Sequence, residues 1–336
     1  MRELTFVKAR DLEWREAEEP RLEADREAIV RPLSVATCDL DAMVIAGRTP
    51  YKGPFAFGHE CVAEVTEVGD AVSAVEPGGL VSVPFQISCG ECASCREGRT
   101  GNCSETPPIA MYGLPVGGRW GGFLSDAVRV PYADAMLVPL PEGVDPAAAA
   151  SVSDNIVDAW RTVGPLLAKR PGAPVLICGG AGSIDVYAVA IAIALGSEQV
   201  DFAGGREGAA KLAADFGADV VAVGFPERLG SYPVTVDASG SHEGLACALR
   251  STSPDGVCTS VGIYFEPTTP VPLLEMYTKG IVFLTGRVHA RPAIPTVLGL
   301  IASGSLDPTP VTRRAVDWDD APEALAEHLE KLVISR

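Results

Sequence analysis

Short apolar runs, broken by Gly and Pro, fill the first part of the chain. Many of their residues are β-branched, and turn residues separate one run from the next, which is typical of strands. Strands at this spacing predict an all-β, barrel-like domain over residues 1–146. The runs are AIVRPLSVAT, CVAEVTEVG, GLVSVPF, FLSDAVRVP and AMLVPLP, which begin at residues 28, 61, 79, 123 and 135.

After residue 146 the pattern changes to short apolar strands that alternate with helical periodicity. This alternation predicts an α/β domain with a doubly wound parallel sheet of the Rossmann type over residues 147–288. The tail returns to a helix over 293–302, a short strand and an amphipathic end around 321–332. The predicted strands cover 174–179, 200–204, 219–223, 234–239, 257–261 and 281–286, and the helices cover 184–195, 207–216 and 242–249.

Composition and charge narrow the class of protein. The 336 residues, 47% of them hydrophobic, suffice for two domains with cores of their own. A formal net charge of −17 disfavours nucleic acid and anionic membranes as partners, because both bind basic surfaces. The N-terminus lacks the apolar core of a secretion signal, and the longest apolar stretch, 186–195, is too short to cross a bilayer. We therefore expect a cytoplasmic protein whose spare thiols stay reduced.

Four cysteines within a short segment form the most specific motif in the chain. Cys89, Cys92, Cys95 and Cys103 follow the spacing C-x2-C-x2-C-x7-C. Four thiolates at this spacing predict a closed, tetrahedral Zn²⁺ site, which is structural rather than catalytic. The iron–sulfur run of ferredoxins is one alternative, but its last gap is about three residues and is followed by Pro. Two disulfides are the other, and nothing else in the sequence indicates an oxidising compartment.

A glycine-rich turn between the first strand and first helix of the second domain predicts a dinucleotide site. Gly180 is expected to permit the tight turn, and Gly182 to let the backbone approach a pyrophosphate at the helix N-terminus. Ser183 and Ile184 open the helix. Asp185 replaces the third glycine of the fingerprint; its carboxylate suits the helix dipole but crowds the packing and repels a pyrophosphate. A Rossmann-type sheet that has lost its nucleotide is the alternative.

The end of the second strand of this domain predicts which nucleotide binds. An NAD site usually places an acid there for the ribose 2′-hydroxyl, whereas an Arg accommodates the 2′-phosphate of NADP. Gly204 stands in the place of the acid, and Gly205 and Arg206 follow. Asp201 lies inside the strand and is less well placed. NADP(H) is therefore the predicted cofactor. The alternative is that Arg206 is an exposed residue with no part in binding.

Three more residues are candidate metal ligands. Read alone, Cys38 could be a small buried hydrophobe, His59 a satisfied polar residue and Asp154 a helix N-cap. Taken with the other motifs, they make the chain resemble the zinc-dependent medium-chain dehydrogenases of the alcohol dehydrogenase superfamily over nearly its whole length. The resemblance rests on Cys38, Gly58-His59-Glu60, the four-cysteine lobe and Gly180-x-Gly182, in this order and spacing.

The resemblance implies a GroES-like catalytic domain, completed by residues 289–336, next to the Rossmann domain. It also implies that Cys38, His59 and Asp154 hold a catalytic zinc, because one bacterial NADP-dependent branch of the family has Asp where Cys is more common. Three protein ligands leave one position open, so the metal can polarise a carbonyl or stabilise an alkoxide during hydride transfer.

The same resemblance implies roles for two further acidic residues. Glu60 matches the family's close neighbour of the metal, which can replace water as a ligand. Asp41 matches the acid that orients the ligand histidine, here His59.

The chain departs from the family along the proton path. Leu40 stands where the family usually has Ser or Thr, and Met43 stands where it usually has a relay His. Asp158 replaces a Thr near the nicotinamide. Asp39, Asp158 or a zinc-bound water could carry the proton instead, and Asp158 could equally be an ordinary polar helix residue.

The sequence therefore predicts a zinc-dependent NADP(H) oxidoreductase with two zinc ions per chain, acting on a small alcohol, aldehyde or ketone. One alternative is a biosynthetic reductase of the same fold that reduces a C=C or C=N bond with a remodelled zinc site. A non-catalytic nucleotide-binding or scaffolding protein is the other. The apolar run 281–284 could form a sheet edge that pairs across a two-fold axis, and we expect a homodimer or homotetramer.

Overall fold

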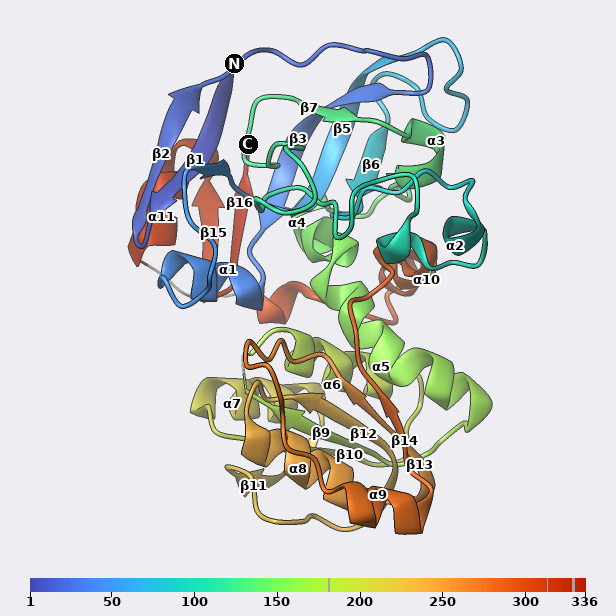
Figure 1. Ribbon diagram of the computed structural model, residues 1–336. Coiled ribbons are helices and arrows are strands. Elements are labelled where there is room, and N and C mark those ends of the chain that lie inside the picture. Colours follow the sequence, from blue (N-terminus) through green and yellow to red (C-terminus); the bar gives the residue numbers. More distant parts are fainter. Residues whose placement is uncertain (181, 313, 328–329) are drawn as a thin grey trace. The chain divides into compact units, whose positions relative to one another are not determined.

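The chain forms two compact units (Figure 1). The boundary between them lies inside helix α5 (Asn155–Lys169), whereas the sequence pattern places it at residue 146. The helix continues across the boundary, so no linker marks it in the sequence. The first unit contains residues 1–157, 288–304 and 312–336, and the second contains 158–287 and 305–311. The computed structural model describes residues 1–180, 182–312, 314–327 and 330–336.

The first unit is a GroES-like arrangement of mostly antiparallel sheets. All five strands expected from the sequence are present, as β3, β5, β6, β7 and β8. Two register shifts interrupt the β3–β5 pairing, one of them at Pro32, which cannot donate to the ladder. The larger sheet runs β15 (Arg314–Asp317), β16 (Leu332–Ser335), β3 (Ala28–Ala36), β5 (Glu60–Val68), β6 (Leu80–Val83) and β8 (Val138–Pro139), with β7 (Val128–Val130) paired to β3.

Further elements complete this unit; of these, the sequence pattern predicted only helix α10 (Ala290–Ala302) and the C-terminal end. A second sheet consists of β2 (Asp11–Glu16), β1 (Arg2–Lys8) and β4 (Phe55–Ala56). The amphipathic end is helical only over α11 (Ala321–Glu327); residues 328 and 329 lie outside the described part, and β16 follows. The other helices are α1 (Asp39–Ile45), α2 (Ala93–Arg96), α3 (Ala133–Met136) and α4 (Pro146–Ala149).

The second unit is a doubly wound Rossmann sheet, as predicted. Every pairing in it is parallel. Of its helices, α9 was not expected from the sequence. The strands run in the order β11 (Asp219–Val223), β10 (Val200–Gly204), β9 (Val175–Gly179), β12 (Tyr232–Ala238), β13 (Thr252–Ser260) and β14 (Val282–Leu284), and the helices are α6 (Ile184–Ala194), α7 (Glu207–Phe216), α8 (His242–Ser251) and α9 (Leu273–Lys279).

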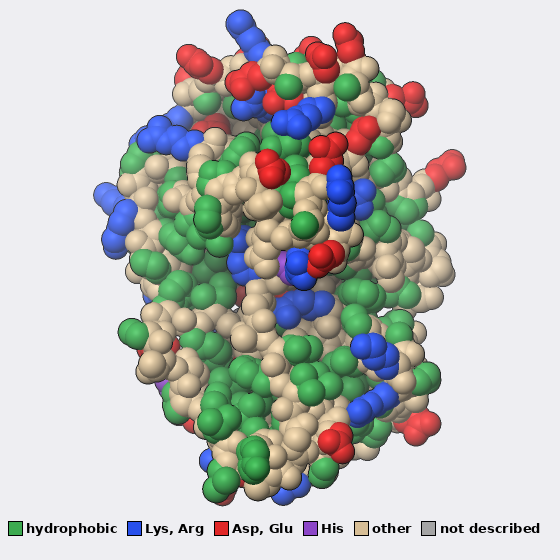
Figure 2. Space-filling view, turned by 45° about the vertical axis from the view of Figure 1, so that its right-hand side comes forward, with side chains coloured by type: hydrophobic (Ala, Val, Ile, Leu, Met, Phe, Trp, Pro, Cys, Tyr) green, Lys and Arg blue, Asp and Glu red, His purple; other side chains and the backbone are tan. Residues whose placement is uncertain are grey.

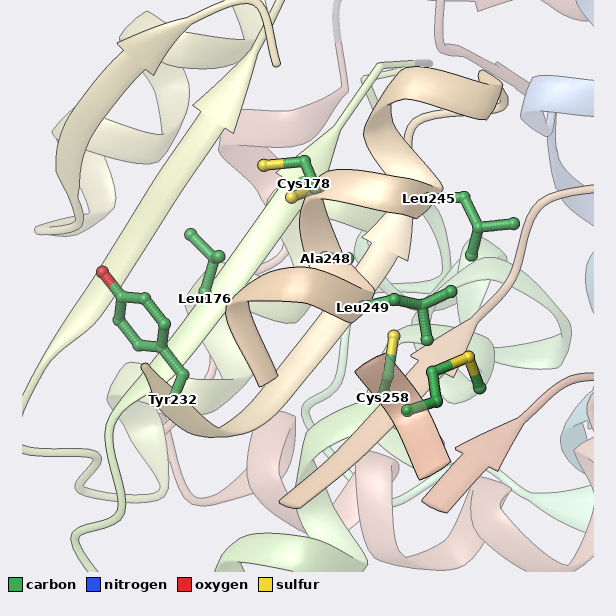
Figure 3. Packing of buried hydrophobic residues seen from close by; sticks show 9 residues of the cluster. Leu176, Cys178, Tyr232, Leu245, Ala248, Leu249 and Cys258 are labelled. Atoms are coloured by element: carbon green, nitrogen blue, oxygen red, sulfur yellow. The ribbon is translucent and has the colours of Figure 1, made fainter. Parts of the chain in front are cut away.

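One face of this sheet packs on α8 to form an apolar core (Figure 3). Leu176 and Cys178 of β9 and Cys258 of β13 face Leu245 and Leu249 of the helix, and all five are nearly or fully buried. Parallel strands are covered on both sides, which is why they appear in the sequence as continuous apolar runs rather than alternating ones.

The surface carries charges of both signs. On the face shown in Figure 2, acidic and basic side chains are interspersed rather than gathered by sign. Among the residues that the structure describes, no helix has the length and apolar character needed to span a membrane.

Candidate metal centres and nucleotide site

The four lobe cysteines converge on one point. Their sulfur atoms all lie within 4.8 Å of one another, and all four are free thiols. Cys89 Sγ lies 4.0 Å from Cys95 Sγ, and Cys92 Sγ lies 4.0 Å from Cys103 Sγ. Sulfurs at the corners of a tetrahedron around zinc are roughly 3.8 Å apart, given a Zn–S distance of about 2.3 Å. The lobe therefore fits a structural zinc ion.

Backbone groups of the lobe stabilise negative charge on these sulfurs. The N–H groups of Cys89, Glu91 and Cys92 donate to lobe sulfurs at 3.3–3.4 Å. Hydrogen bonds from Ser104 lower the pKa of the Cys92 thiol to about 5, whereas burial raises that of Cys95. Thiolate is the form that binds metal, so this backbone arrangement favours the bound state.

The lobe is anchored to helix α10, far along the chain. Nε2 of Gln86 donates to the carbonyl of Val288 at 2.7 Å, and its Oε1 accepts from the N–H of Ala290 at 3.2 Å. The N–H of Gly101 donates to Nδ1 of His289 at 3.1 Å. These hydrogen bonds therefore link the lobe to the start of the C-terminal segment.

The structure brings together the second predicted ligand set, Cys38, His59 and Asp154. Nε2 of His59 lies 3.0 Å from Cys38 Sγ and 3.5 Å from Asp154 Oδ2. One possible ligand atom from each residue lies within 4.8 Å of the others, and all three residues are largely buried. A buried thiol, imidazole and carboxylate that face one another are costly without a cation, so this trio fits a zinc ion.

Local sequence explains how each ligand reaches this point. Cys38 is the N-cap of α1, and Asp41 accepts a hydrogen bond from its backbone N–H at 2.9 Å, as in a capping box. Gly58, with φ of +94°, turns the chain just before His59 and β5. Asp154 follows a 3₁₀ turn (Ala150–Ser153), which a hydrogen bond from the Cys61 N–H to Ser153 Oγ ties to β5.

Asp41 also faces the far side of the imidazole. Its Oδ1 lies 3.5 Å from Nδ1 of His59, and neither atom has a hydrogen-bond partner among the residues that the structure describes. Burial opposes charge on His59, but the groups of Asp41 and Cys38 outweigh it and raise its pKa well above the usual range. Asp41 is therefore placed to orient the ring.

Glu60 lies beside this trio, but its carboxylate is bound to other groups. Its Oε2 accepts from Nζ of Lys331 at 2.7 Å, and its Oε1 accepts from the N–H of Asn155 at 3.2 Å. Nζ of Lys331 also donates to the side-chain oxygen of Asn155 at 3.1 Å, and Asn155 donates to Asp154 at 3.4 Å. Sequence reasoning missed both Lys331 and Asn155, because neither belongs to a recognisable motif.

The glycine-rich turn lies where the sequence predicts it, but its two glycines are needed for reasons other than those expected. Gly182 has φ of +101°, so it is the residue that needs left-handed freedom. Gly180 lies outside that region; it is required because a Cβ there would overlap the backbone of Ser239. Ala181 lies outside the described residues. Ser183 and Ile184 begin α6 as predicted.

Asp185 is accommodated by a neighbouring glycine. Its side chain lies against Cα of Gly179 and is 1% exposed, and any Cβ at Gly179 would overlap it. Its Oδ1 accepts from the N–H of Val186 at 2.8 Å. The crowding expected from the sequence is thus relieved within β9, while a carboxylate stays in the first turn of the helix.

The end of β10 presents Arg206 but constrains Gly204. Gly205 and Arg206 are exposed, and Gly205 has open space around its Cα. A Cβ at Gly204 would lie 2.7 Å from the ring of Phe202. Oδ2 of Asp201 accepts from Gln199 Nε2 at 2.9 Å and from the Tyr232 hydroxyl, and the residue is only 2% exposed, so it does not face a ribose at the surface.

Comparison with known proteins decides the family. Residues 24–142 match the family model of the alcohol dehydrogenase GroES-like domain. The chain is 26% identical over 315 residues to a probable zinc-binding alcohol dehydrogenase of Mycobacterium tuberculosis, which covers 92% of this chain and 80% of that protein. Its structure matches an alcohol dehydrogenase from Thermus sp. ATN1 with a TM-score of 0.87 and 26% identity, covering 100% of this chain and 99% of that one. The chain belongs to the zinc-dependent medium-chain dehydrogenase/reductase superfamily.

A partial match shows the same relationship. The chain is 32% identical over 203 residues to a glutathione-independent formaldehyde dehydrogenase of Pseudomonas aeruginosa, covering 58% of this chain and only 50% of that protein. The similarity to zinc-type dehydrogenases supports oxidoreductase chemistry for this member of the superfamily.

The structure shows the surroundings of the residues that depart from the family's usual proton path. Leu40 and Met43 lie half-buried on α1. Asp158 is ion-paired with Arg161, whose Nη2 also donates to the carbonyl of Gly286 at 2.7 Å. The Asp158 carboxylate is thus engaged in an ion pair with a residue one turn along the same helix.

Proposed function

We propose that this chain is a zinc-dependent NADP(H) oxidoreductase acting on a small alcohol, aldehyde or ketone. The observation that carries the proposal is the buried trio of Cys38, His59 and Asp154 in the same chain as a nucleotide-type turn. The three side chains would hold a zinc ion and leave a fourth position for the substrate oxygen. Bound zinc would supply Lewis acidity there, and the nicotinamide would exchange hydride with the substrate carbon.

The neighbouring charges match the needs of a divalent cation. Cys38 and Asp154 offer two negative charges as ligands, which equal the charge of Zn²⁺. Lys331 offsets the carboxylate of Glu60, so that group adds no net charge beside the trio. Asp41 holds the imidazole of His59 from behind.

The proposed cofactor is NADP(H) rather than NAD(H). Gly204 places no acid at the end of β10, where a carboxylate would repel a 2′-phosphate. Arg206 is exposed one residue beyond Gly205 and can make a charge-assisted, bidentate contact with phosphate.

A reductase of C=C or C=N bonds is the second candidate, favoured by one observation. Leu40 and Met43 cannot exchange protons, so α1 offers no relay for an alcohol proton at these two positions. Such an enzyme would keep the cofactor and would need no proton release from an alcohol; the proton that balances hydride addition would come from solvent to the second atom of the reduced bond.

Assembly into a homodimer, or a tetramer of two such dimers, is part of the proposal. Edge strand β14 exposes Val282 (49%) and Leu284 (44%), and α9 exposes Tyr277 (82%). A second copy could extend the sheet by pairing edge to edge across a two-fold axis. Sedimentation analysis of wild type and Val282→Lys tests this, since a charge at the edge should give monomers.

The decisive test measures zinc content, nucleotide binding and turnover on one preparation. We expect two zinc ions, saturable NADPH binding and carbonyl reduction by the wild type, with His59→Ala inactive but still able to bind NADPH. Comparing ketones with conjugated alkenes and imines distinguishes the two candidates. Wild-type turnover by His59→Ala would refute the catalytic role of the trio.

A further inference from the structure

Asp237 is a buried carboxylate at the C-terminal end of β12, outside the sites described above. β12 lies beside β9, where the strand order changes direction from β9–β10–β11 to β12–β13–β14. In open parallel sheets, ligands bind at this switch point, outside the carboxyl ends of the strands. Asp237 is 0% exposed and pairs with Cys178, two residues before Gly180.

Four hydrogen bonds saturate the Asp237 carboxylate. Oδ1 accepts from the N–H and Oγ of Ser239 at 3.2 and 2.6 Å. Oδ2 accepts from Ser260 Oγ at 2.7 Å and from the Tyr264 hydroxyl at 2.9 Å. Burial, together with the nearby carboxylate, raises the pKa of Tyr264, so its hydroxyl stays a donor. Bonds to a charged acceptor are stronger than neutral ones, and Ser239 is fixed accordingly.

Ser239 fills the space between two glycines. Its backbone lies against Cα of Gly180 and its side chain against Cα of Gly244, so a Cβ on either glycine would overlap it. Its Oγ also accepts from the N–H of Ser241 at 3.1 Å, and Ser241 caps α8 through the N–H of Gly244 at 3.0 Å. Ser239 therefore links the glycine-rich turn to the start of α8.

We infer that Asp237, acting through Ser239, is a positioning residue that sets the path of the glycine-rich turn and hence its affinity for the nucleotide. The inference rests on the proposed nucleotide site at this turn. Gly180 cannot shift toward β12 without meeting Ser239, and Ser239 cannot retreat without breaking its bonds to Asp237. Asp237 thus restrains the glycine-rich turn through Ser239 and not by contact with the nucleotide.

Two matched serine variants separate positioning from general stability. Ser239→Ala and Ser260→Ala each remove one hydroxyl that donates to Asp237, at 2.6 and 2.7 Å, but only Ser239 touches Gly180. We expect similar decreases in Tm and unchanged zinc content for both. Ser239→Ala alone should weaken binding of NADPH and NADH by about fivefold, measured by fluorescence titration of the zinc-loaded protein.

The possible results are distinct. Equal nucleotide affinity in the two variants would overturn the inference, because the network would then only stabilise the fold. If Ser239→Ala does not fold, Ser239→Cys keeps the volume with a weaker donor and replaces it in the same comparison. A wild type that binds neither nucleotide overturns the proposed function and this inference together. A wild type that binds them, with Ser239→Ala unchanged, overturns the inference alone.

Discussion

Nζ of Lys331 lies 2.7 Å from Oε2 of Glu60, and the two side chains are only 3% and 0% exposed. The pair joins the residue just before β16, near the end of the chain, to β5 at the proposed catalytic centre. Burial raises the pKa of Glu60 to about 7, and the ammonium group of Lys331 opposes a further rise. A buried charge without its partner is far more costly than the pair.

We predict that Lys331→Met lowers the free energy of unfolding by about 3–5 kcal/mol, because it leaves the Glu60 carboxylate unpaired. Urea denaturation measures the loss. Lys331→Arg is the matched control, since it keeps the charge. Adding Glu60→Gln to Lys331→Met should recover much of the stability, and additive losses in the double variant would contradict the coupling.

The two metal centres should be separable by elemental analysis. Wild type should hold two zinc ions, and Cys95→Ser should lose the lobe zinc together with stability, because a structural site contributes folding free energy. His59→Ala should keep the lobe zinc and its fold but lose turnover. One zinc or none in carefully purified wild type would exclude the two-centre arrangement.

Cofactor preference should depend on Arg206. A charge-assisted contact contributes about 1.5–3 kcal/mol, which corresponds to roughly a 10- to 150-fold preference for NADPH over NADH. Arg206→Ala should remove most of it, and adding Gly205→Asp should favour NADH, because Gly205 has room for a side chain. Gly204→Asp is a poor choice, since its Cβ would meet the ring of Phe202. Equal affinity of wild type for the two nucleotides would show that Arg206 does not bind the phosphate.

Introducing a hydroxyl on α1 should change the ratio of alcohol oxidation to carbonyl reduction. Leu40→Ser should raise alcohol oxidation relative to carbonyl reduction near neutral pH, because a hydroxyl can pass on the alcohol proton. Leu40→Ala provides the control for the lost side-chain volume. If both variants behave alike, the missing hydroxyl is not what limits oxidation.

Asp158→Asn should leave the shape of the pH–rate profile unchanged, because the Asp158 carboxylate is engaged in an ion pair with Arg161. Loss of that half-buried pair should lower stability only modestly. A profile that shifts along the pH axis would instead identify Asp158 as a proton carrier.

The sequence predicted those features that local patterns encode. All six strands of the second unit are short apolar runs, including the exposed β11 and β14, so all six were found. The spacing of Cys89 to Cys103 was sufficient to place the lobe. Lys331 was missed because nothing near it in the sequence shows that Glu60 lies opposite.

Two glycines, Gly180 and Gly204, also have roles that the local motif does not reveal. Gly180 was assigned to a tight turn, but the structure requires it for contact with Ser239, which lies on another strand. Gly204 was interpreted only as a glycine in the place of an acid, and only the three-dimensional arrangement places the ring of Phe202 beside it. Requirements that arise from tertiary contacts leave no trace in local sequence.

The two metal centres also differ in how much of the chain must exist before they can form. A nascent chain has all four lobe thiols once residue 103 has been made, whereas the second centre needs Asp154 and gains the counter-ion of Glu60 only with Lys331. Because domains fold from the N-terminus during synthesis, the lobe can take up zinc long before the proposed catalytic centre is complete. A prematurely terminated chain would therefore retain metal while lacking a finished reactive site.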